Sequence, residues 1–436
     1  MLGIENRNLS LPNNHAERNS IEMSKPRIVL LQLLILFCVA GAGSLNAQDA
    51  KRKDADKAIR PFKIQVEDKV LADLRERLAR TRFPDQIEGS GWGYGVDLGY
   101  MKRLVAYWRE KYDWREQERR LNQFDQFLTE IDGIDIHFIH QRSKHKNARA
   151  LLLTHGWPGS FYEFYKTIGP LTDPTAHGGK AEDAFHVVVP SLVGFGFSGK
   201  PKKPGWSVNR MSEVMAKLMA RLGYSRYGAQ GGDWGAGVSR WLGTYDSEHV
   251  IGVHLNFPPG SPPRVRNIWE GVTAAERKRW EQRRRELAKH FGYSSIQGTR
   301  PQTLGFALND SPAGQAAWII DKFWAWSDHG GNLEKSFTKD ELLTNVMIYW
   351  VTNTGASSAR IYFERQPHTG GRRAGKVPIG CALFPKEINV PPRKWVEARL
   401  NLVHWTEMPR GGHFAALEEP ELLVKDIRKF FGGLDK

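Results

Sequence analysis

Residues Gly231-Gly232-Asp233-Trp234-Gly235 place one reactive side chain among small neighbours. They follow the short run 227–230 and lead into a helix-compatible run, 236–242. A strand, a glycine-flanked reactive residue and a helix are typical of a nucleophile elbow, whose sharp turn exposes one side chain above a sheet. A carboxylate that attacks a saturated carbon forms an alkyl ester, which water can cleave afterwards. The alternative interpretation is an ordinary turn, in which Asp233 caps the helix.

Aspartate at the elbow therefore predicts attack on an electrophilic carbon, as in an epoxide or a haloalkane. Serine at this position would open a strained ether to give a second ether that the protein could not release. Because Asp233 occupies the position, we exclude a serine esterase.

Cleavage of the ester requires a general base to activate water. In hydrolases with this elbow, the histidine comes last in the chain, in a loop after the final strand. His413 fits, because it follows the strand-like run 403–406 and precedes the helical run 420–431. The neighbouring His404 lies within the strand-like run, where we expect it to pack.

A carboxylate should orient this histidine and stabilise its charged form. It is expected after the preceding strand, and Glu387 comes directly after the apolar run 378–384. We therefore predict Glu387 as the acid, and we interpret Glu397 and Glu407 as surface charges.

An oxyanion hole for the ester needs two backbone N–H groups, one after the nucleophile and one from the loop after the third core strand. Trp234 follows the nucleophile, and Trp157 lies in the loop 154–160 that follows an apolar run. These two amides are the predicted donors. His155 in the same loop is interpreted as a buried structural histidine and not as the base.

The strand-like and helix-compatible segments that must position these residues alternate along the chain, which predicts a mostly parallel sheet in an α/β fold. Asp132-Gly133 between two alternating runs predicts a β-hairpin. Such sheets carry their active sites at the carboxyl ends of the strands. The apolar runs 150–153, 185–189 and 227–230 are separated by the helix-compatible segments 161–168 and 208–222.

A long helical interruption separates the strand-like run 252–255 from the one at 378–384. Apolar residues recur at helical spacing in 313–326 and 342–349, which predicts a cap over the elbow. Opening an epoxide creates an alkoxide, so the cap should donate hydrogen bonds, and tyrosine does this without being charged at neutral pH. Tyr293 and Tyr362 are candidates, although the residues alone also fit two ordinary half-buried tyrosines.

Before the hairpin, apolar residues at helical spacing in 66–80 and 100–108 predict a helical N-terminal module. The glycine-rich segment 89–95 between them predicts a loop.

The composition of the 436 residues, with 15 tryptophans and 40% apolar residues, favours a packed globular enzyme. The formal net charge of +15 suggests an anionic partner. However, Arg and Lys in 277–285 are interleaved with Glu, as on a solvated helix face, and no nucleic-acid motif accompanies them. We predict no nucleic-acid partner.

Residues 1–22 are polar, and we interpret them as disordered or as preceding the true start at Met23. A basic stretch, the apolar run 28–40 and a small-residue tail ending at Ala47 then predict a secretory signal in 23–47, and hence export. The alternative is a retained membrane anchor, and membrane association is expected only in that case. Cys381 would be the only thiol of the processed chain, which excludes an intramolecular disulfide.

These residues resemble the microsomal-type epoxide hydrolases, including the juvenile-hormone-type enzymes, over roughly 60–435. The motifs that carry the resemblance are His155-Gly156-Trp157-Pro158-Gly159, Gly231-Gly232-Asp233-Trp234-Gly235, Ala307-Leu308-Asn309-Asp310-Ser311-Pro312, Phe384-Pro385-Lys386-Glu387-Ile388 and Arg410-Gly411-Gly412-His413-Phe414-Ala415-Ala416.

The resemblance implies Asp233 as nucleophile, His413 and Glu387 as base and acid, and Tyr293 and Tyr362 as donors to the epoxide oxygen. It also implies an α/β-hydrolase fold, a mostly parallel sheet flanked by helices, with a helical cap inserted before the acid-bearing strand. The expected boundaries are 58–125 for the N-terminal module, 126–258 and 376–436 for the core, and 259–375 for the cap.

The expected reaction converts an apolar epoxide, a small-molecule substrate, and water to a vicinal diol, without a metal or an organic cofactor. Two alternatives stay open. A haloalkane dehalogenase shares the aspartate and would bind halide through tryptophan N–H groups such as those of Trp157 and Trp234. A non-catalytic binder of lipophilic ligands would keep the fold without turnover. The residues do not predict an oligomeric state or a biological substrate.

Overall fold

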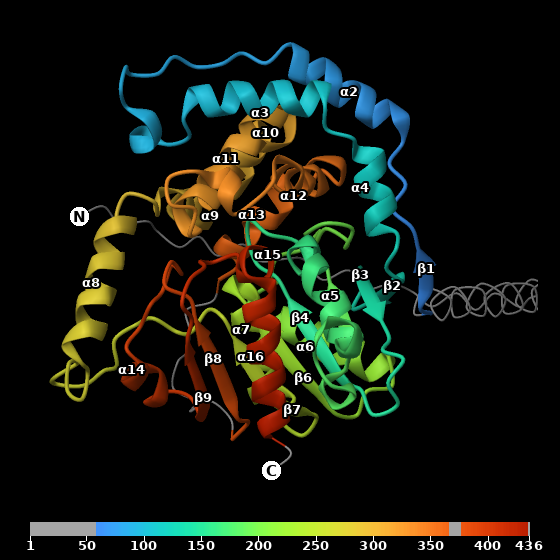
Figure 1. Cartoon of the computed structure of the whole chain (residues 1–436). Helices are drawn as coiled ribbons and strands as arrows, with labels where there is room; N and C mark the ends of the chain where they lie inside the picture. The colour runs from blue at the N-terminus through green and yellow to red at the C-terminus, as the bar shows by residue number, and fades with distance from the viewer. Residues whose placement is uncertain (1–57, 366–375, 435–436) are drawn as a thin grey trace, which may run out of the picture. The chain divides into compact units, whose positions relative to one another are not determined.

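The computed structural model describes residues 58–365 and 376–434. Its centre is a nine-stranded sheet with the order β1-β2-β3-β5-β4-β6-β7-β8-β9 (Figure 1). The predicted secretory signal and the polar segment before it lie outside the described residues. Within the described residues, no helix has the length and apolar character needed to cross a membrane.

The first three strands are antiparallel and form one edge of the sheet. The predicted hairpin is confirmed: β2 (Gln126–Ile131) and β3 (Ile134–Gln141) pair around a turn with positive φ at Asp132 and Gly133. Strand β1 (Arg60–Phe62), which was not predicted, pairs with β2. The N-terminal segment is therefore not purely helical, because its first residues extend the sheet.

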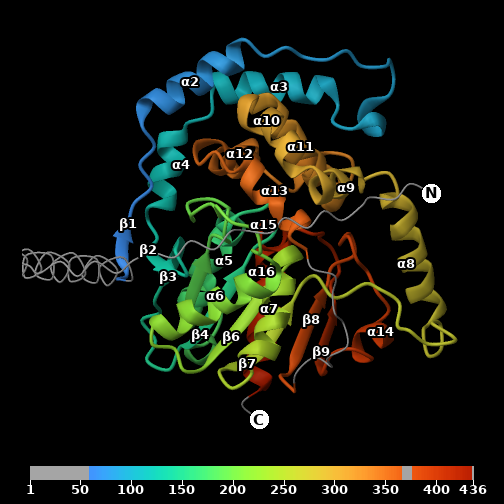
Figure 2. The ribbon, with the colours of Figure 1, turned by 180° about the vertical axis from the view of Figure 1, so that it is seen from behind.

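The remaining six strands are parallel to one another, and all of them except the edge strand at 402–407 are largely buried, as expected for a parallel sheet covered on both faces. Helices α5 (Tyr165–Thr172) and α16 (Pro420–Gly433) cover one face, and α6 (Val208–Arg221) and α7 (Asp233–Tyr245) cover the other (Figures 1 and 2). This arrangement confirms the predicted α/β-hydrolase fold. The parallel strands are β4 (Arg149–Thr154), β5 (Phe185–Pro190), β6 (Tyr227–Gly231), β7 (Val250–Leu255), β8 (Ile379–Leu383) and β9 (Leu402–Glu407).

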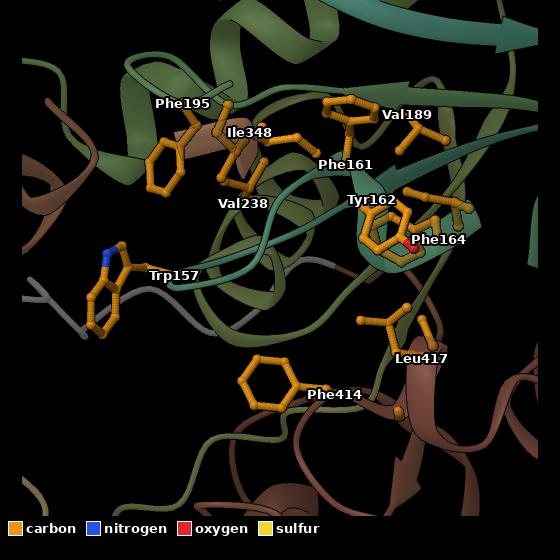
Figure 3. Close-up of a cluster of buried hydrophobic side chains, with 14 of the residues drawn as sticks. Trp157, Phe161, Tyr162, Phe164, Val189, Phe195, Val238, Ile348, Phe414 and Leu417 are labelled. Atoms are coloured by element: carbon orange, nitrogen blue, oxygen red, sulfur yellow. The ribbon is translucent and has the colours of Figure 1, made fainter. Parts of the chain in front are cut away.

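Between β7 and β8, the described residues form six α-helices of an insertion, most of which lies above the carboxyl ends of the strands (Figures 1 and 2). Ile348 of this insertion belongs to the same buried cluster as Phe195, Val238 and Phe414 of the sheet domain (Figure 3). The insertion is therefore packed onto the core through apolar side chains. Its helices are α8 (Ala274–Leu287), α9 (Gly292–Thr299), α10 (Pro301–Asp310), α11 (Pro312–Trp326), α12 (Lys339–Val351) and α13 (Gly355–Phe363).

The N-terminal helices α2 (Asp68–Ala79) and α3 (Leu98–Glu110) lie on the far side of the insertion from the sheet, while α4 (Trp114–Leu121) leads back to β2 (Figures 1 and 2). The glycine-rich segment predicted as a loop contains a short 3₁₀ helix, Gly91–Tyr94. Its Trp92 ring stacks on Trp324 of α11 at 4.0 Å between centroids. The glycines thus let one aromatic side chain reach the cap.

Candidate active site

Asp233 sits in a sharp turn between β6 and α7 with a positive φ of 47°. This conformation is strained for a residue with a side chain. The turn fits only because its neighbours are glycines: a Cβ on Gly235 would lie 1.9 Å from the Thr154 carbonyl oxygen. A Cβ on Gly156 would lie 2.2 Å from Asp233 Oδ1. The sequence therefore folds into the sharp strand-turn-helix that a nucleophile elbow requires, with the Asp233 carboxylate close to the neighbouring loop.

Sheet register brings the two predicted oxyanion amides to the Asp233 carboxylate. Thr154 at the end of β4 pairs with Gly231 at the end of β6, so the loops that follow start side by side. The Trp157 N–H donates to Asp233 Oδ1 at 2.8 Å, and the backbone N–H of Trp234 also binds the carboxylate. One carboxylate oxygen is thus held by a backbone amide.

His413 and Glu387 come together because the loops after β8 and β9 pair with each other. Lys386 and Gly412 form a parallel bridge, and the Lys386 N–H donates to the Gly411 carbonyl. The His413 Nδ1 atom lies 2.6 Å from Glu387 Oε1, while its Nε2 atom lies 3.6 Å from Asp233 Oδ2. The imidazole therefore lies between two carboxylates.

Burial and the neighbouring charges shift the pKa values of Asp233 and His413. Burial raises the pKa of Asp233, although His413 and the two backbone amides oppose this effect. Burial lowers the pKa of His413, but the charge and hydrogen bond of Glu387 and the charges of Asp233 and Glu163 raise it to about 9. The base expected near neutral pKa is thus protonated at neutral pH as long as Asp233 is ionised.

Tyr293 of α9 and Tyr362 of α13 pack against Trp157 and Trp234, the two residues whose amides were predicted to form the oxyanion hole. The Tyr293 ring is stacked with Trp157 at 5.1 Å, and the Tyr362 ring is edge-on to Trp234 at 4.8 Å. Burial, and in each case the charge of Asp233, raise the pKa of both phenols, so both are neutral donors. The buried Tyr362 hydroxyl has no hydrogen-bond partner among the described residues. The other four predicted side chains are therefore gathered around the Asp233 carboxylate.

Arg283 contributes to the site and was missed in the sequence. We interpreted 283–285 as part of a solvated helix face, and this is wrong for Arg283, which is 7% exposed. Its guanidinium donates to the backbone carbonyls of Lys386 at 2.5 Å and Glu387 at 2.9 Å. Arg283 thus holds the loop that carries the acid. Its position one turn before the buried Leu287 was the available signal.

Glu163 is a second side chain that the sequence analysis did not select. A Cβ on Gly159 would overlap its carboxyl group, and its carboxyl binds the backbone N–H of Gly156. Burial raises the pKa of Glu163 to about 8; the nearby His413 lowers it and Asp233 raises it. Gly159, which makes room for this carboxyl group, belongs to the loop motif 155–159. Its position four residues before Glu163 was therefore a signal that the sequence offered.

The residues that we set aside as non-catalytic have structural partners. Both ring nitrogens of buried His155 are bonded to backbone, to the Gly156 carbonyl and the Leu192 N–H. His404 lies in β9 and binds Asp426. Glu407 is an exposed partner of Arg279, and Glu397 pairs with Arg393 and Lys394. In the described part of the chain, no three His, Cys, Asp or Glu side chains gather as they would around a metal ion.

Two protein families match consecutive parts of the chain. Residues 59–164 match the family described as the epoxide hydrolase N terminus, and residues 149–289 match the α/β-hydrolase fold.

Individual relatives match over most of their length. The chain is 41% identical to epoxide hydrolase 1 of Sus scrofa over 415 residues, which covers 87% of this chain and 90% of that one. Its structure superposes on juvenile hormone epoxide hydrolase from the silkworm Bombyx mori with a TM-score of 0.81 and 33% identity, covering 87% and 95% of the two chains. For Aspergillus niger epoxide hydrolase, the TM-score is 0.76 and the identity 32%, with coverage of 87% and 97%.

Proposed function

Since the chain belongs to the epoxide hydrolase family and is an epoxide hydrolase, we propose that it converts an apolar epoxide to a vicinal diol through an ester on Asp233. Asp233 acts as nucleophile, Tyr293 and Tyr362 as acids, and His413 with Glu387 as the base pair. The two substrates are the epoxide and water.

In the first step, Asp233 Oδ2 attacks a carbon of the epoxide ring. We assign Oδ2 because Oδ1 already accepts the Trp157 N–H. A new bond forms between Oδ2 and carbon, and the bond from that carbon to the epoxide oxygen breaks. The oxygen leaves as an alkoxide, which the phenol groups of Tyr293 and Tyr362 stabilise and protonate.

In the second step, His413 takes a proton from water, and the resulting hydroxide attacks the ester carbonyl carbon. The oxyanion develops on Oδ1, where the amides of Trp157 and Trp234 contribute on the order of 3 kcal/mol each. The bond between Cγ and Oδ2, the alkyl–oxygen leaving group, then breaks, and His413 returns its proton to the second hydroxyl of the diol. The new Asp233 carboxyl group ionises, and its proton restores the tyrosine.

Ester formation also activates the base. The charge of Asp233 is one of the causes that raise the pKa of His413. An ester carries no charge, so the pKa of His413 falls as soon as the first step is complete. The imidazole then loses its proton more readily and can act as a base. The first step thereby prepares His413 to act as the base in the second step.

The observation that carries this proposal is the arrangement around one carboxylate. Asp233 accepts the Trp157 amide at 2.8 Å through one oxygen and faces His413 Nε2 at 3.6 Å with the other. A structural aspartate that caps a helix would need neither contact. The family assignment favours this reaction over the haloalkane and ligand-binding alternatives.

A single turnover in H₂¹⁸O, with enzyme in excess over a small aryl epoxide, tests the mechanism. Both diol oxygens should be unlabelled, because one derives from the epoxide and the other from Asp233 Oδ2. Mass spectrometry of the Asp233 peptide should show one ¹⁸O. Label in the diol from the first turnover would instead indicate direct attack by water and contradict the ester. Asp233→Asn, the matched control, should give no diol.

A further inference from the structure

Lys322 of α11 is a buried lysine beside one of the two proposed acids. Its residue is 4% exposed, and its Nζ atom lies 2.5 Å from Asp321 Oδ2. The same Nζ atom lies over the Tyr293 ring, 4.7 Å from its centroid, and 5.8 Å from the Trp326 ring centroid. Burying an ammonium group has a large desolvation cost, so the position of this charge requires an explanation.

The aromatic rings supply part of the compensation. A cation over a ring is attracted by the negative face of its π-system, and the attraction is stronger when both are desolvated. Asp321 is the more exposed partner of the ion pair, with 19% side-chain exposure against 5% for Lys322, so water screens the carboxylate more than the ammonium. The less screened charge of the pair is therefore the ammonium group, which lies over the Tyr293 ring.

This charge acts on the function proposed for Tyr293. As the phenol hydrogen bonds to a developing alkoxide, electron density on its oxygen and ring increases. A cation at the ring stabilises that change more than it stabilises the neutral phenol. Burial works in the opposite direction, because it disfavours any charge on the phenol oxygen.

We propose that Lys322 is a positioning residue whose ammonium group strengthens Tyr293 as the acid that opens the epoxide ring. The inference rests on the proposed function, since it acts through Tyr293. It also makes the two tyrosines unequal: among the described residues, no lysine or arginine lies over the Tyr362 ring as Lys322 lies over Tyr293. Tyr293 is then the stronger donor.

The test measures the first step alone. In a His413→Gln background the ester cannot be hydrolysed by the proposed base, so the rate at which the intact chain gains the mass of styrene oxide reports alkylation of Asp233. Lys322→Met, which keeps the length of the side chain and removes the charge, should lower this rate about tenfold. Lys322→Arg should retain most of it.

A double-mutant cycle separates this role from packing. Lys322→Met should have no further effect in Tyr293→Phe, and it should keep its tenfold effect in Tyr362→Phe. Lys339→Met is the matched control, because Lys339 also lies over a tyrosine ring, at 5.5 Å from Tyr107, and pairs with Glu334. It should leave the alkylation rate unchanged.

Two results would overturn the inference. One is an unchanged alkylation rate in Lys322→Met. The other is an equal loss in the Tyr293→Phe background, which would assign Lys322 to packing of α11. If the parent protein with intact Asp233 forms no ester at all, the proposed function itself fails, and this outcome is distinct from both.

Discussion

The Nε2 atom of His413 lies 3.6 Å from Oδ2 of Asp233, which is too long for a hydrogen bond but short enough for strong electrostatic coupling. In the proposed mechanism, Asp233 therefore remains free to attack, because its Oδ2 oxygen is not bonded to His413. At the same time, the Asp233 charge would keep the imidazole protonated until the ester has formed. The coupling would thus order the two proposed steps in time.

Glu387→Gln should shift the pH dependence of ester hydrolysis. The charge of Glu387 raises the pKa of His413, so its removal lowers that pKa. Because the active base is the neutral form, which exists above the pKa, the rising limb of the hydrolysis rate should move to lower pH. The plateau should fall by about 10³-fold, since the imidazolium loses its stabilising partner. Single-turnover rates of ester hydrolysis, measured between pH 5 and pH 10, check this prediction. Glu397→Gln is the control and should not shift the pH at which the hydrolysis rate rises.

Tyr362→Phe should slow alkylation by about 100-fold and Tyr293→Phe by more, because each removes a donor to the alkoxide and Tyr293 is the stronger of the two. Hydrolysis of an ester already formed should be unaffected, since it depends on His413. Rapid-quench measurement of ester formation and decay distinguishes the two steps. Equal slowing of both steps would place the tyrosines outside the proposed role.

Arg283→Lys should slow ester hydrolysis by about tenfold and leave alkylation nearly unchanged. Arg283 binds the carbonyls of Lys386 and Glu387 through two different nitrogens, and a lysine cannot reproduce this geometry. The Glu387 loop should then orient His413 less well. Arg284→Lys on the exposed side of α8 is the control. A change confined to alkylation would contradict the assignment.

Gly235→Ala should destabilise the fold by about 3 kcal/mol or more, because the new Cβ would lie 1.9 Å from the Thr154 backbone oxygen. Neither α7 nor β4 can move away without disrupting the sheet. Gly432→Ala in α16 is the matched control, since its Cβ would meet nothing within 4 Å. It should be neutral or stabilising by up to about 1 kcal/mol. Thermal unfolding followed by circular dichroism measures both.

Asp426→Asn should cost about 2 kcal/mol of stability at pH 7, because it weakens a buried cluster. Asp426 accepts from Thr406 at 2.6 Å and contacts His404 and His254 at 2.9 and 3.0 Å. Burial raises the pKa of Asp426, but these partners lower it below its usual value. The contribution of ionised Asp426 to the free energy of unfolding is thus present above about pH 4, and it is lost as pH falls through the pKa of Asp426 in the folded protein. The difference in the free energy of urea unfolding between the wild type and Asp426→Asn should become smaller below pH 4. A difference that does not change with pH would contradict this link between stability and the protonation of Asp426.

The order of reactive residues along the chain was predictable, because each follows a strand of a parallel sheet. Asp233, Glu387 and His413 come after β6, β8 and β9 in that order. Local residue types also sufficed for the hairpin at Asp132-Gly133 and for the elbow, since glycines report directly on tight turns.

Long-range contacts depended on the tertiary structure. A run of basic residues does not reveal that Arg283 turns inward while its neighbours stay in solvent, because the acceptor loop lies over 100 residues away in the chain. Similarly, Lys322 acquires its position over Tyr293 only when α9 and α11 pack together. The sequence by itself determined which groups are candidates for the chemistry, since residue types and tight turns are local. The tertiary structure decided which charges surround these groups, since an electrostatic environment depends on what is brought within a few ångströms.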